Sequence, residues 1–140
     1  MNKYCDIIEY DKIGRIISIY IKVVGIQYNY EYNDENRTRI CTIFSENNKS
    51  NYKTTIYQHL TDNDEYIDCK SITEGDTYDL EIKYDELGKE IELKRVNKKS
   101  NTNYKKTTFR NKLGNPKIWI EEYDKKKSIG FKVDMNKIMN

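Results

Sequence analysis

The 140-residue sequence contains no alanine, only one proline and six glycines, and a single histidine. Alanine favours helices, whereas the abundant isoleucine, threonine and tyrosine favour strands, so a β-rich fold is expected. Lysine, isoleucine, asparagine and tyrosine together make up nearly half of the chain. A- and T-rich codons encode these four residues, so the composition is typical of an AT-rich genome.

The sequence also lacks the segments that direct proteins into or across membranes. No apolar run approaches the roughly 18 residues of a membrane span, and the first ten residues, which include Asp6 and Glu9, lack the apolar centre of a signal peptide. The three cysteines, Cys5, Cys41 and Cys69, are widely spaced and form no CxxC pair. They indicate neither a disulfide framework nor a zinc site. We therefore expect a cytoplasmic protein that binds no membrane, metal or cofactor.

Acidic residues are absent from one long segment. Residues 93–120 hold nine lysines and arginines and no aspartate or glutamate, whereas residues 1–92 hold 11 basic and 19 acidic residues. Aromatic residues are interleaved with the cations of this acid-free segment. Cations with spaced aromatics suit a flexible polyanion whose bases can stack. An acidic body beside a basic segment equally suits self-association or a protein partner.

The first long element is expected at about residues 13–32. Apolar and polar residues alternate from Ile17 to Val23, and the alternation resumes with the opposite parity from Ile26 to Tyr32. A change of phase at Gly25 is typical of a β-bulge, so this segment is predicted to be one long, bent strand of a small barrel. Tyr28, Tyr30 and Tyr32 then share one face, either as core packing, which we favour, or as a stacking platform for bases.

The remaining pattern predicts one domain with a short helix and no internal repeat. Strands are expected at about residues 37–45, 52–60, 78–84 and 89–96, with a helix start at Thr61 or Asp62. The four-residue turn Asp85–Gly88 predicts a hairpin. Residues 98–116 read as a polar, basic connection, and residues 117–123 and 128–134 as a C-terminal hairpin.

Three strands, a short helix and two strands are the element order of an OB-fold. The segment Ile72–Leu80 resembles the entry to the fourth strand of that fold. The resemblance covers residues 10–97 and points to single-stranded-DNA-binding proteins of phages and plasmids. It implies a five-stranded barrel whose ligand lies across the second and third strands. On that surface it places Arg37, Arg39, Phe44, Lys53 and Tyr57.

Catalysis is not expected. His59 has no cysteine or second histidine near it in the sequence, and no glycine-rich phosphate loop is present. The acidic residues from Asp62 to Asp68 do not follow the calcium-loop pattern, because the sixth position is Ile67 rather than glycine.

These observations support two hypotheses. The first is a non-enzymatic protein that binds single-stranded nucleic acid with little sequence preference; DNA is favoured over RNA, although the sequence does not distinguish the two. Besides the five residues of the OB-like surface, it would use cations and aromatics of the acid-free segment: Lys94, Arg95, Lys98, Lys99, Tyr104, Lys105, Lys106, Phe109, Arg110, Lys117 and Trp119. The second is a protein-binding β-barrel, such as a phage-encoded inhibitor of host defence or an immunity-type protein, in which the basic segment pairs with a neighbouring copy in a homo-oligomer.

Overall fold

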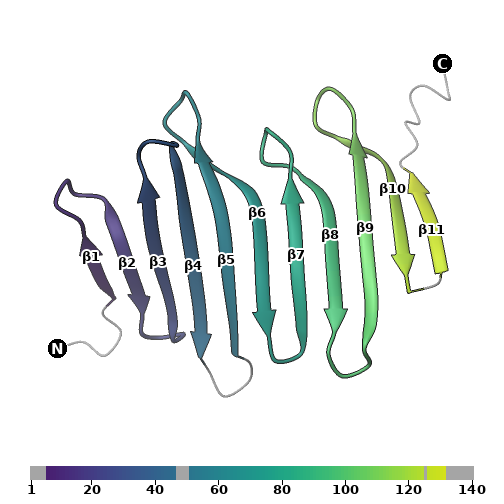
Figure 1. The fold of residues 1–140 in the computed structure, drawn as a ribbon, viewed down its shortest axis with the longest axis horizontal. Helices are drawn as coiled ribbons and strands as arrows, with labels where there is room; N and C mark the ends of the chain where they lie inside the picture. The colour runs from purple at the N-terminus through teal and green to yellow at the C-terminus, as the bar shows by residue number, and fades with distance from the viewer. Residues whose placement is uncertain (1–5, 47–50, 125, 132–140) are drawn as a thin grey trace.

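The computed structural model describes residues 6–46, 51–124 and 126–131. These residues form eleven antiparallel strands in one open sheet, and the strands lie side by side in chain order (Figure 1). The strands are β1 (Ile7–Tyr10), β2 (Ile16–Ile21), β3 (Ile26–Asn33), β4 (Thr38–Glu46), β5 (Asn51–Leu60), β6 (Tyr66–Gly75), β7 (Tyr78–Tyr84), β8 (Glu90–Asn97), β9 (Thr102–Arg110), β10 (Pro116–Tyr123) and β11 (Lys126–Phe131).

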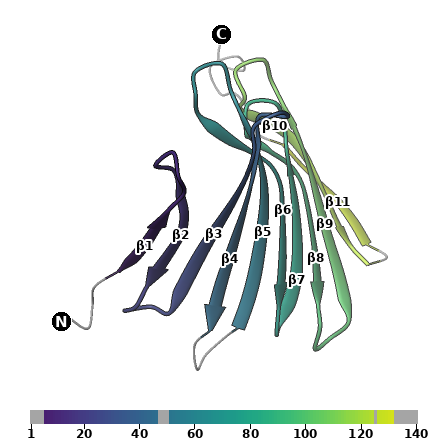
Figure 2. The ribbon, with the colours of Figure 1, turned by 60° about the vertical axis from the view of Figure 1, so that its left-hand side comes forward.

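The all-β class is confirmed, but the five-stranded barrel is wrong. A barrel requires its first and last strands to pair, whereas β1 and β11 are the two outer edges of this sheet. Figure 2 shows the strands fanning out within a single twisted layer. The described residues contain no helix that is long and apolar enough to span a membrane.

The predicted bent first strand is two strands. β2 and β3 pair in an antiparallel hairpin with Ile21 opposite Ile26, and residues 22–25 form the turn between them. The amide of Gly25 donates to the carbonyl of Ile21 at 2.9 Å, and Gly25 has a φ of 66°. A glycine with positive φ and a reversal of phase are common to a bulge and to a tight turn, so the sequence pattern alone did not separate them.

The expected helix after Leu60 is also absent, because residues 61–65 form a hairpin turn between β5 and β6. Thr61 does act as a cap, but of the turn, since its hydroxyl accepts the amide of Glu65 at 3.3 Å. Residues 98–116 contain β9, which pairs with β8 and β10, rather than an irregular connection. The hairpins expected around Asp85–Gly88 and at the C-terminal end are confirmed, although residues 132–134 lie outside the described part.

One turn geometry recurs in the loops at one end of the strands. The hairpins β1–β2, β5–β6, β7–β8 and β9–β10 each close with a five-residue loop, whose first residues are Asp11, Thr61, Asp85 and Asn111. In every one the first amide donates to the fifth carbonyl, the fourth amide donates to the first carbonyl, and the fourth residue has positive φ.

The loops begin 50, 24 and 26 residues apart along the chain. The last two spacings give a unit of about 25 residues per hairpin, and the first equals two such units. The β3–β4 turn occupies the missing place, with its own positive-φ residue, Arg37. The structure therefore contains a recurrent hairpin that the sequence pattern did not predict.

The buried residues of the described chain are all small, and all lie on one face of the sheet. Cys41, Ser45, Ser71 and Thr108 are between 2 and 8% exposed, and the ladder of paired residues places the four on the same side. Two of them are in contact with rings on that side, Cys41 with Tyr30 and Ser71 with Tyr84. What core the molecule has is thus a layer one side chain deep.

The recurrent turn gives a test of what holds the hairpins. A carboxylate oxygen of Asp85 accepts the amides of Leu87 and Lys89, both at 2.9 Å. Asp85→Ala leaves both amides without this acceptor and is expected to lower the free energy of unfolding by about 1 kcal/mol. Thermal or urea unfolding measures the change.

Asn111 makes the same two bonds in the β9–β10 loop, at 3.0 and 2.9 Å, so Asp85→Asn should be nearly neutral. Glu86→Ala, in the same loop, is the matched control. Equal destabilisation by Asp85→Asn and Asp85→Ala would contradict this account of the turn.

Candidate interaction face

The two faces of the sheet carry different side chains, because successive residues of a strand point to opposite sides. We call the side that contains the four buried residues the aromatic face. Following the register across the sheet, its rings are Tyr28, Tyr30, Tyr32, Tyr52, Tyr66, Tyr78, Tyr84, Tyr104, Trp119 and Tyr123. Between them lie aliphatic side chains: Ile19, Ile21, Ile26, Ile43, Ile56, Leu80, Ile82 and Leu93.

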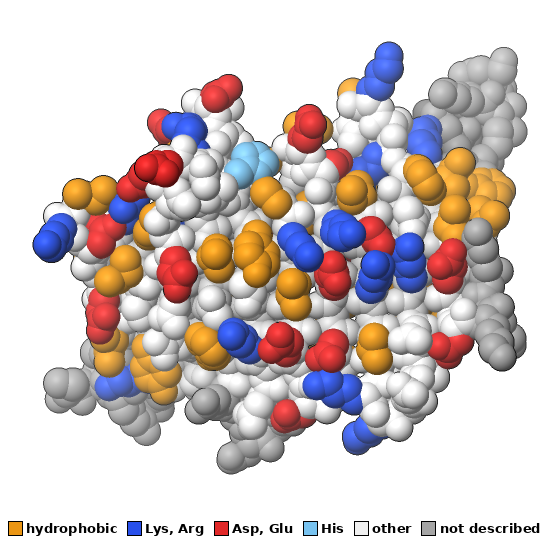
Figure 3. Space-filling model, in the orientation of Figure 1, with side chains coloured by type: hydrophobic (Ala, Val, Ile, Leu, Met, Phe, Trp, Pro, Cys, Tyr) orange, Lys and Arg blue, Asp and Glu red, His pale blue; other side chains and the backbone are white. Residues whose placement is uncertain are grey.

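The opposite side is the charged face, which Figure 3 views directly. Lysines and acids alternate over β5 to β10: Lys53, Lys70, Glu74, Asp79, Glu81, Lys83, Glu92, Lys94, Lys105 and Glu122. It also carries apolar side chains, above all near the β11 edge, where Phe109, Ile118 and Phe131 are 51, 45 and 64% exposed. The charged face is otherwise an ordinary solvated sheet surface.

The cations of the aromatic face are mostly arginines, and they stack on its rings. The guanidinium of Arg39 lies 4.0 Å from the ring centroid of Tyr66 and 4.8 Å from that of Tyr30. Its Nε donates to Gln58 at 2.8 Å, which fixes its plane. A cation over an aromatic ring is worth about 0.5–1 kcal/mol at an exposed site and more when water is excluded. The side chains of this cluster are therefore already held in place, and the attraction between cation and ring would become stronger if another surface excluded water from them.

A second cluster lies over β8 to β11. Arg95 is stacked 5.0 Å from the centroid of Tyr104, whose ring in turn contacts Tyr123 at 4.8 Å. The Lys106 ammonium lies 5.8 Å from the centroid of the Trp119 ring. The indole lies so close to Gly130 of β11 that a methyl group there would overlap it. Glycine is required at that position because the indole takes the place of a side chain.

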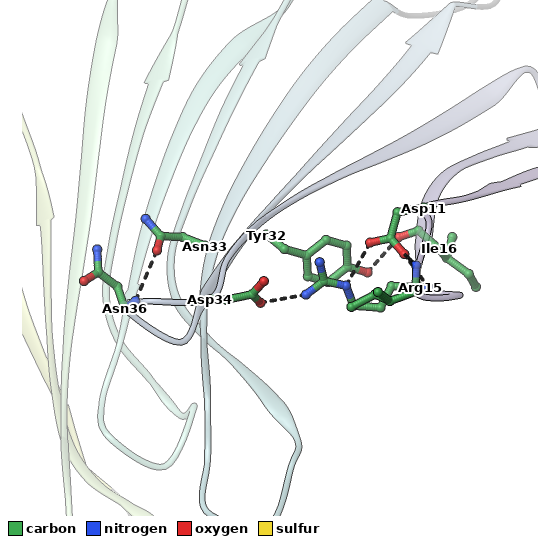
Figure 4. A network of polar contacts seen from close by, with 8 residues as sticks. Asp11, Arg15, Ile16, Tyr32, Asn33, Asp34 and Asn36 are labelled. Carbon is green, nitrogen blue, oxygen red and sulfur yellow. Dashed lines mark hydrogen bonds and ion pairs between the residues drawn. The ribbon is translucent and has the colours of Figure 1, made fainter.

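At the β1–β2 corner a third arginine joins separate hairpins. Arg15 donates to Asp11 at 2.9 Å and to Asp34 of the β3–β4 turn at 2.7 Å (Figure 4). Its guanidinium lies 4.2 Å from the centroid of Tyr32, whose hydroxyl donates to the Ile16 carbonyl at 2.7 Å. The pKa of Asp11 is lowered because its hydrogen bonds to Arg15 and Ile13 outweigh desolvation.

Glu92 is the centre of an ion-pair cluster on the charged face. Its carboxylate lies 3.4 Å from Lys94 and from Lys105, and 3.6 Å from Lys83. Desolvation would raise the pKa of Glu92, but the three lysines outweigh it and lower the pKa below the usual range. One acid of β8 thus ties together β7, β8 and β9.

The sixteen residues predicted to bind nucleic acid do not form one surface. Arg39, Arg95, Tyr104, Lys106, Arg110 and Trp119 lie on the aromatic face. The opposite face holds Phe44, Lys53, Tyr57, Lys94, Lys105 and Phe109. The remaining four lie in turns or at a strand start: Arg37, Lys98, Lys99 and Lys117.

Much of the charge in the acid-free segment is used within the sheet. Lys94 and Lys105 pair with Glu92, and Lys98 pairs with Asp79 at 3.3 Å. Arg110 donates to the backbone carbonyl of Glu90 at 2.6 and 2.9 Å. These cations are less available to an external polyanion than their sequence suggested, although nucleic-acid binding stays a prediction.

Strand pairing also brings His59 and Cys69 together, which sequence reasoning missed. The Nδ1 of His59 lies 2.9 Å from the Cys69 sulfur, across the β5–β6 pair. Desolvation, with a contribution from Asp68, raises the pKa of the thiol. Reactive cysteines usually have a lowered pKa, whereas burial raises that of Cys69. The described residues hold no group of three or more metal-ligating side chains.

The Glu92 cluster predicts a pH-dependent contribution to stability. Glu92→Gln is expected to lower the free energy of unfolding by about 1 kcal/mol at pH 7, since it removes three partly exposed pairs. A depressed folded pKa contributes stability above the unfolded pKa and loses it as the pH falls through the folded value. The difference between variant and wild type should therefore begin to shrink as the pH falls towards about 4.3 and vanish only below the lowered pKa of folded Glu92.

Urea unfolding at pH 7, 5 and 3.5 measures this difference. Glu81→Gln removes an acid with one close lysine, Lys70 at 3.4 Å, and is the matched control with a smaller effect. A difference for Glu92→Gln that persists undiminished at pH 3.5 would show that packing rather than charge explains it.

The chain was compared with protein-family models and with curated proteins. No family model matches it, and no curated protein matches it significantly.

Proposed function

We propose that this chain is a non-enzymatic protein-binding module whose binding surface is the aromatic face. The observation that carries the proposal is the sorting of side chains between the two faces. Arg39, Arg95 and Arg110 lie on the aromatic face with most of the strand tyrosines and Trp119, whereas lysines and acids lie mainly on the other.

That composition is the one found at the centre of protein–protein interfaces. Interface cores are enriched in tyrosine, tryptophan and arginine and depleted of lysine, glutamate and aspartate relative to other surface. Truncation of such aromatic and arginine residues usually costs the most binding energy. Because Arg39 and Arg95 are already stacked on rings, little side-chain entropy remains to be lost when a partner covers them.

A single-stranded nucleic acid is the competing ligand for the same rings. It requires phosphate partners, but the cations of the aromatic face, Arg39, Arg95, Lys106 and Arg110, are nearly balanced by Asp68, Glu90 and Glu121. Affinity for a polyanion depends on uncompensated cations. The geometry therefore supports a protein partner better.

Capture by the tagged chain from a nuclease-treated lysate that also contains the untagged chain tests the proposal with matched tyrosine variants. Tyr30→Ser removes a ring of the Arg39 cluster, and Tyr57→Ser removes a 40% exposed ring from the charged face. Wild type and Tyr57→Ser should retain a protein in near-stoichiometric amount, and Tyr30→Ser should retain it at least about 10-fold more weakly. Circular dichroism confirms that both variants fold.

Equal retention by the two variants, or no retained protein, would contradict the proposal. Labelled oligo-dT provides the opposing measurement. Binding to it with a slope of log K against log salt of about −3 to −4 would indicate about five phosphate contacts and favour nucleic acid instead.

A further inference from the structure

The aromatic face lacks a covering layer in the described part of the chain. Domains are normally built from two or more packed layers, because a sheet with an apolar face must bury it against another element. Here Ile43, Ile56, Leu80 and Ile82 lie at the centre of the face, yet none of them is fully buried. The buried residues of this face are the small ones, Cys41, Ser45, Ser71 and Thr108. The sheet therefore supplies one of the two layers that normally enclose a hydrophobic core.

We infer that a second copy of this chain covers the aromatic face, forming a two-layered sandwich dimer with the charged faces outside. The inference rests on the proposed function and names the partner of the same surface. Two sheets that pack face to face lie about 10 Å apart, with their side chains interdigitating. A copy supplies a second sheet with the same twist, width and apolar character.

The size of the face agrees with a stable dimer. From β3 to β10 the sheet spans seven strand spacings, about 34 Å, and its strands are about 23 Å long, so the face covers roughly 780 Å². A standard stable interface buries about 800 Å² on each partner. One copy is therefore enough to cover the face.

The charges of the face permit this pairing. Its cations and acids are nearly balanced, so two copies do not repel one another through a net charge. A two-fold axis that runs parallel to the strands and lies in the interface above β7 would bring β4 of each copy, which carries Arg39, over β10 of the other, which carries Glu121. Isologous contacts of this kind form twice and close the assembly at two copies.

The charged face does not offer the same solution. A copy placed on it would bury ten lysines and acids, Glu92 and its three lysines among them, against seven charged side chains on the aromatic face, and the desolvation of charges is costly. The dimer is thus expected to use the aromatic face alone.

Sedimentation equilibrium of the wild-type chain tests the inference, since it reports mass without regard to shape. At concentrations of about 1 to 50 μM the expected mass is twice that of the chain. The temperature of unfolding should also rise with concentration, because covering the face contributes to folding. A mass of one chain throughout this range would overturn the inference.

Two matched isoleucine variants locate the interface. Ile56→Lys places a charge in the middle of the aromatic face, and Ile72→Lys places the same charge on the adjacent strand of the charged face, beside Glu81. Ile56→Lys should weaken the dimer at least about 100-fold, because the charge is buried twice per dimer. Ile72→Lys should leave the dimer intact.

Tyr30→Ser is a milder second variant in case Ile56→Lys does not fold. It should weaken the dimer more than Tyr57→Ser does. A dimer that is insensitive to Ile56→Lys and Tyr30→Ser would overturn the inference, since the copies would then pair through strand edges. A monomer that still retains a different protein, and loses it in Tyr30→Ser, overturns the dimer but not the proposed function. A monomer that binds oligo-dT overturns both.

Discussion

The register of one continuous antiparallel ladder is the constraint on which the rest of this structure depends. Ten strand pairs in series decide which side every residue points to, and no second layer within the described chain corrects an error. A slip of one residue in any pair would exchange the faces of all strands beyond it. The bulges at Glu9–Tyr10, Tyr57–Gln58, Lys83–Tyr84 and Pro116–Ile118 are therefore specific features, because each lies next to a loop and changes the alternation of one strand only at that end.

Side-chain interactions across the strands stabilise this register from both sides. On the charged face Glu92 joins three strands through lysines, and on the aromatic face Arg39 joins β4 to the rings of β3 and β6. Cross-strand pairs of these kinds contribute roughly 0.2–1 kcal/mol each. Pairs of that size define a register but replace only part of a missing hydrophobic core, which is why a covering partner is central to the function we propose.

Local patterns in the sequence predicted local structure well. The alternation around Asp85–Gly88 predicted its hairpin, since strand period and turn chemistry are properties of neighbouring residues. The barrel was wrong because closure depends on whether β1 meets β11, which no local pattern reports. The β2–β3 turn was mistaken for a bulge since a glycine and a reversal of phase fit both. The helix after Leu60 was wrong because an acid-rich cap suits a turn as well as a helix.

The sequence indicated which residue types belong to the candidate site, but not on which face of the sheet each side chain lies. Tyr104, Lys105 and Lys106 were grouped because they are adjacent in the chain, yet Lys105 points away from the other two. Grouping every second residue of each strand would have separated the arginines and rings from the lysines. The repeat was missed because its signature occupies only the first and fourth positions of a loop. Asp, Thr or Asn stands at the first position and Gly or Asp at the fourth, and the β3–β4 copy differs.

The recurrence of one loop at one end of the strands gives the sheet a modular length. The chain enters and leaves every such hairpin at the strand ends opposite these loops. Removing or adding a unit of about 25 residues therefore keeps the direction and the two faces of every remaining strand. The breadth of the aromatic face can then change in steps of two strands while its chemistry stays constant. Duplication of such a unit is a simple evolutionary route to a wider aromatic face, and it needs no new fold.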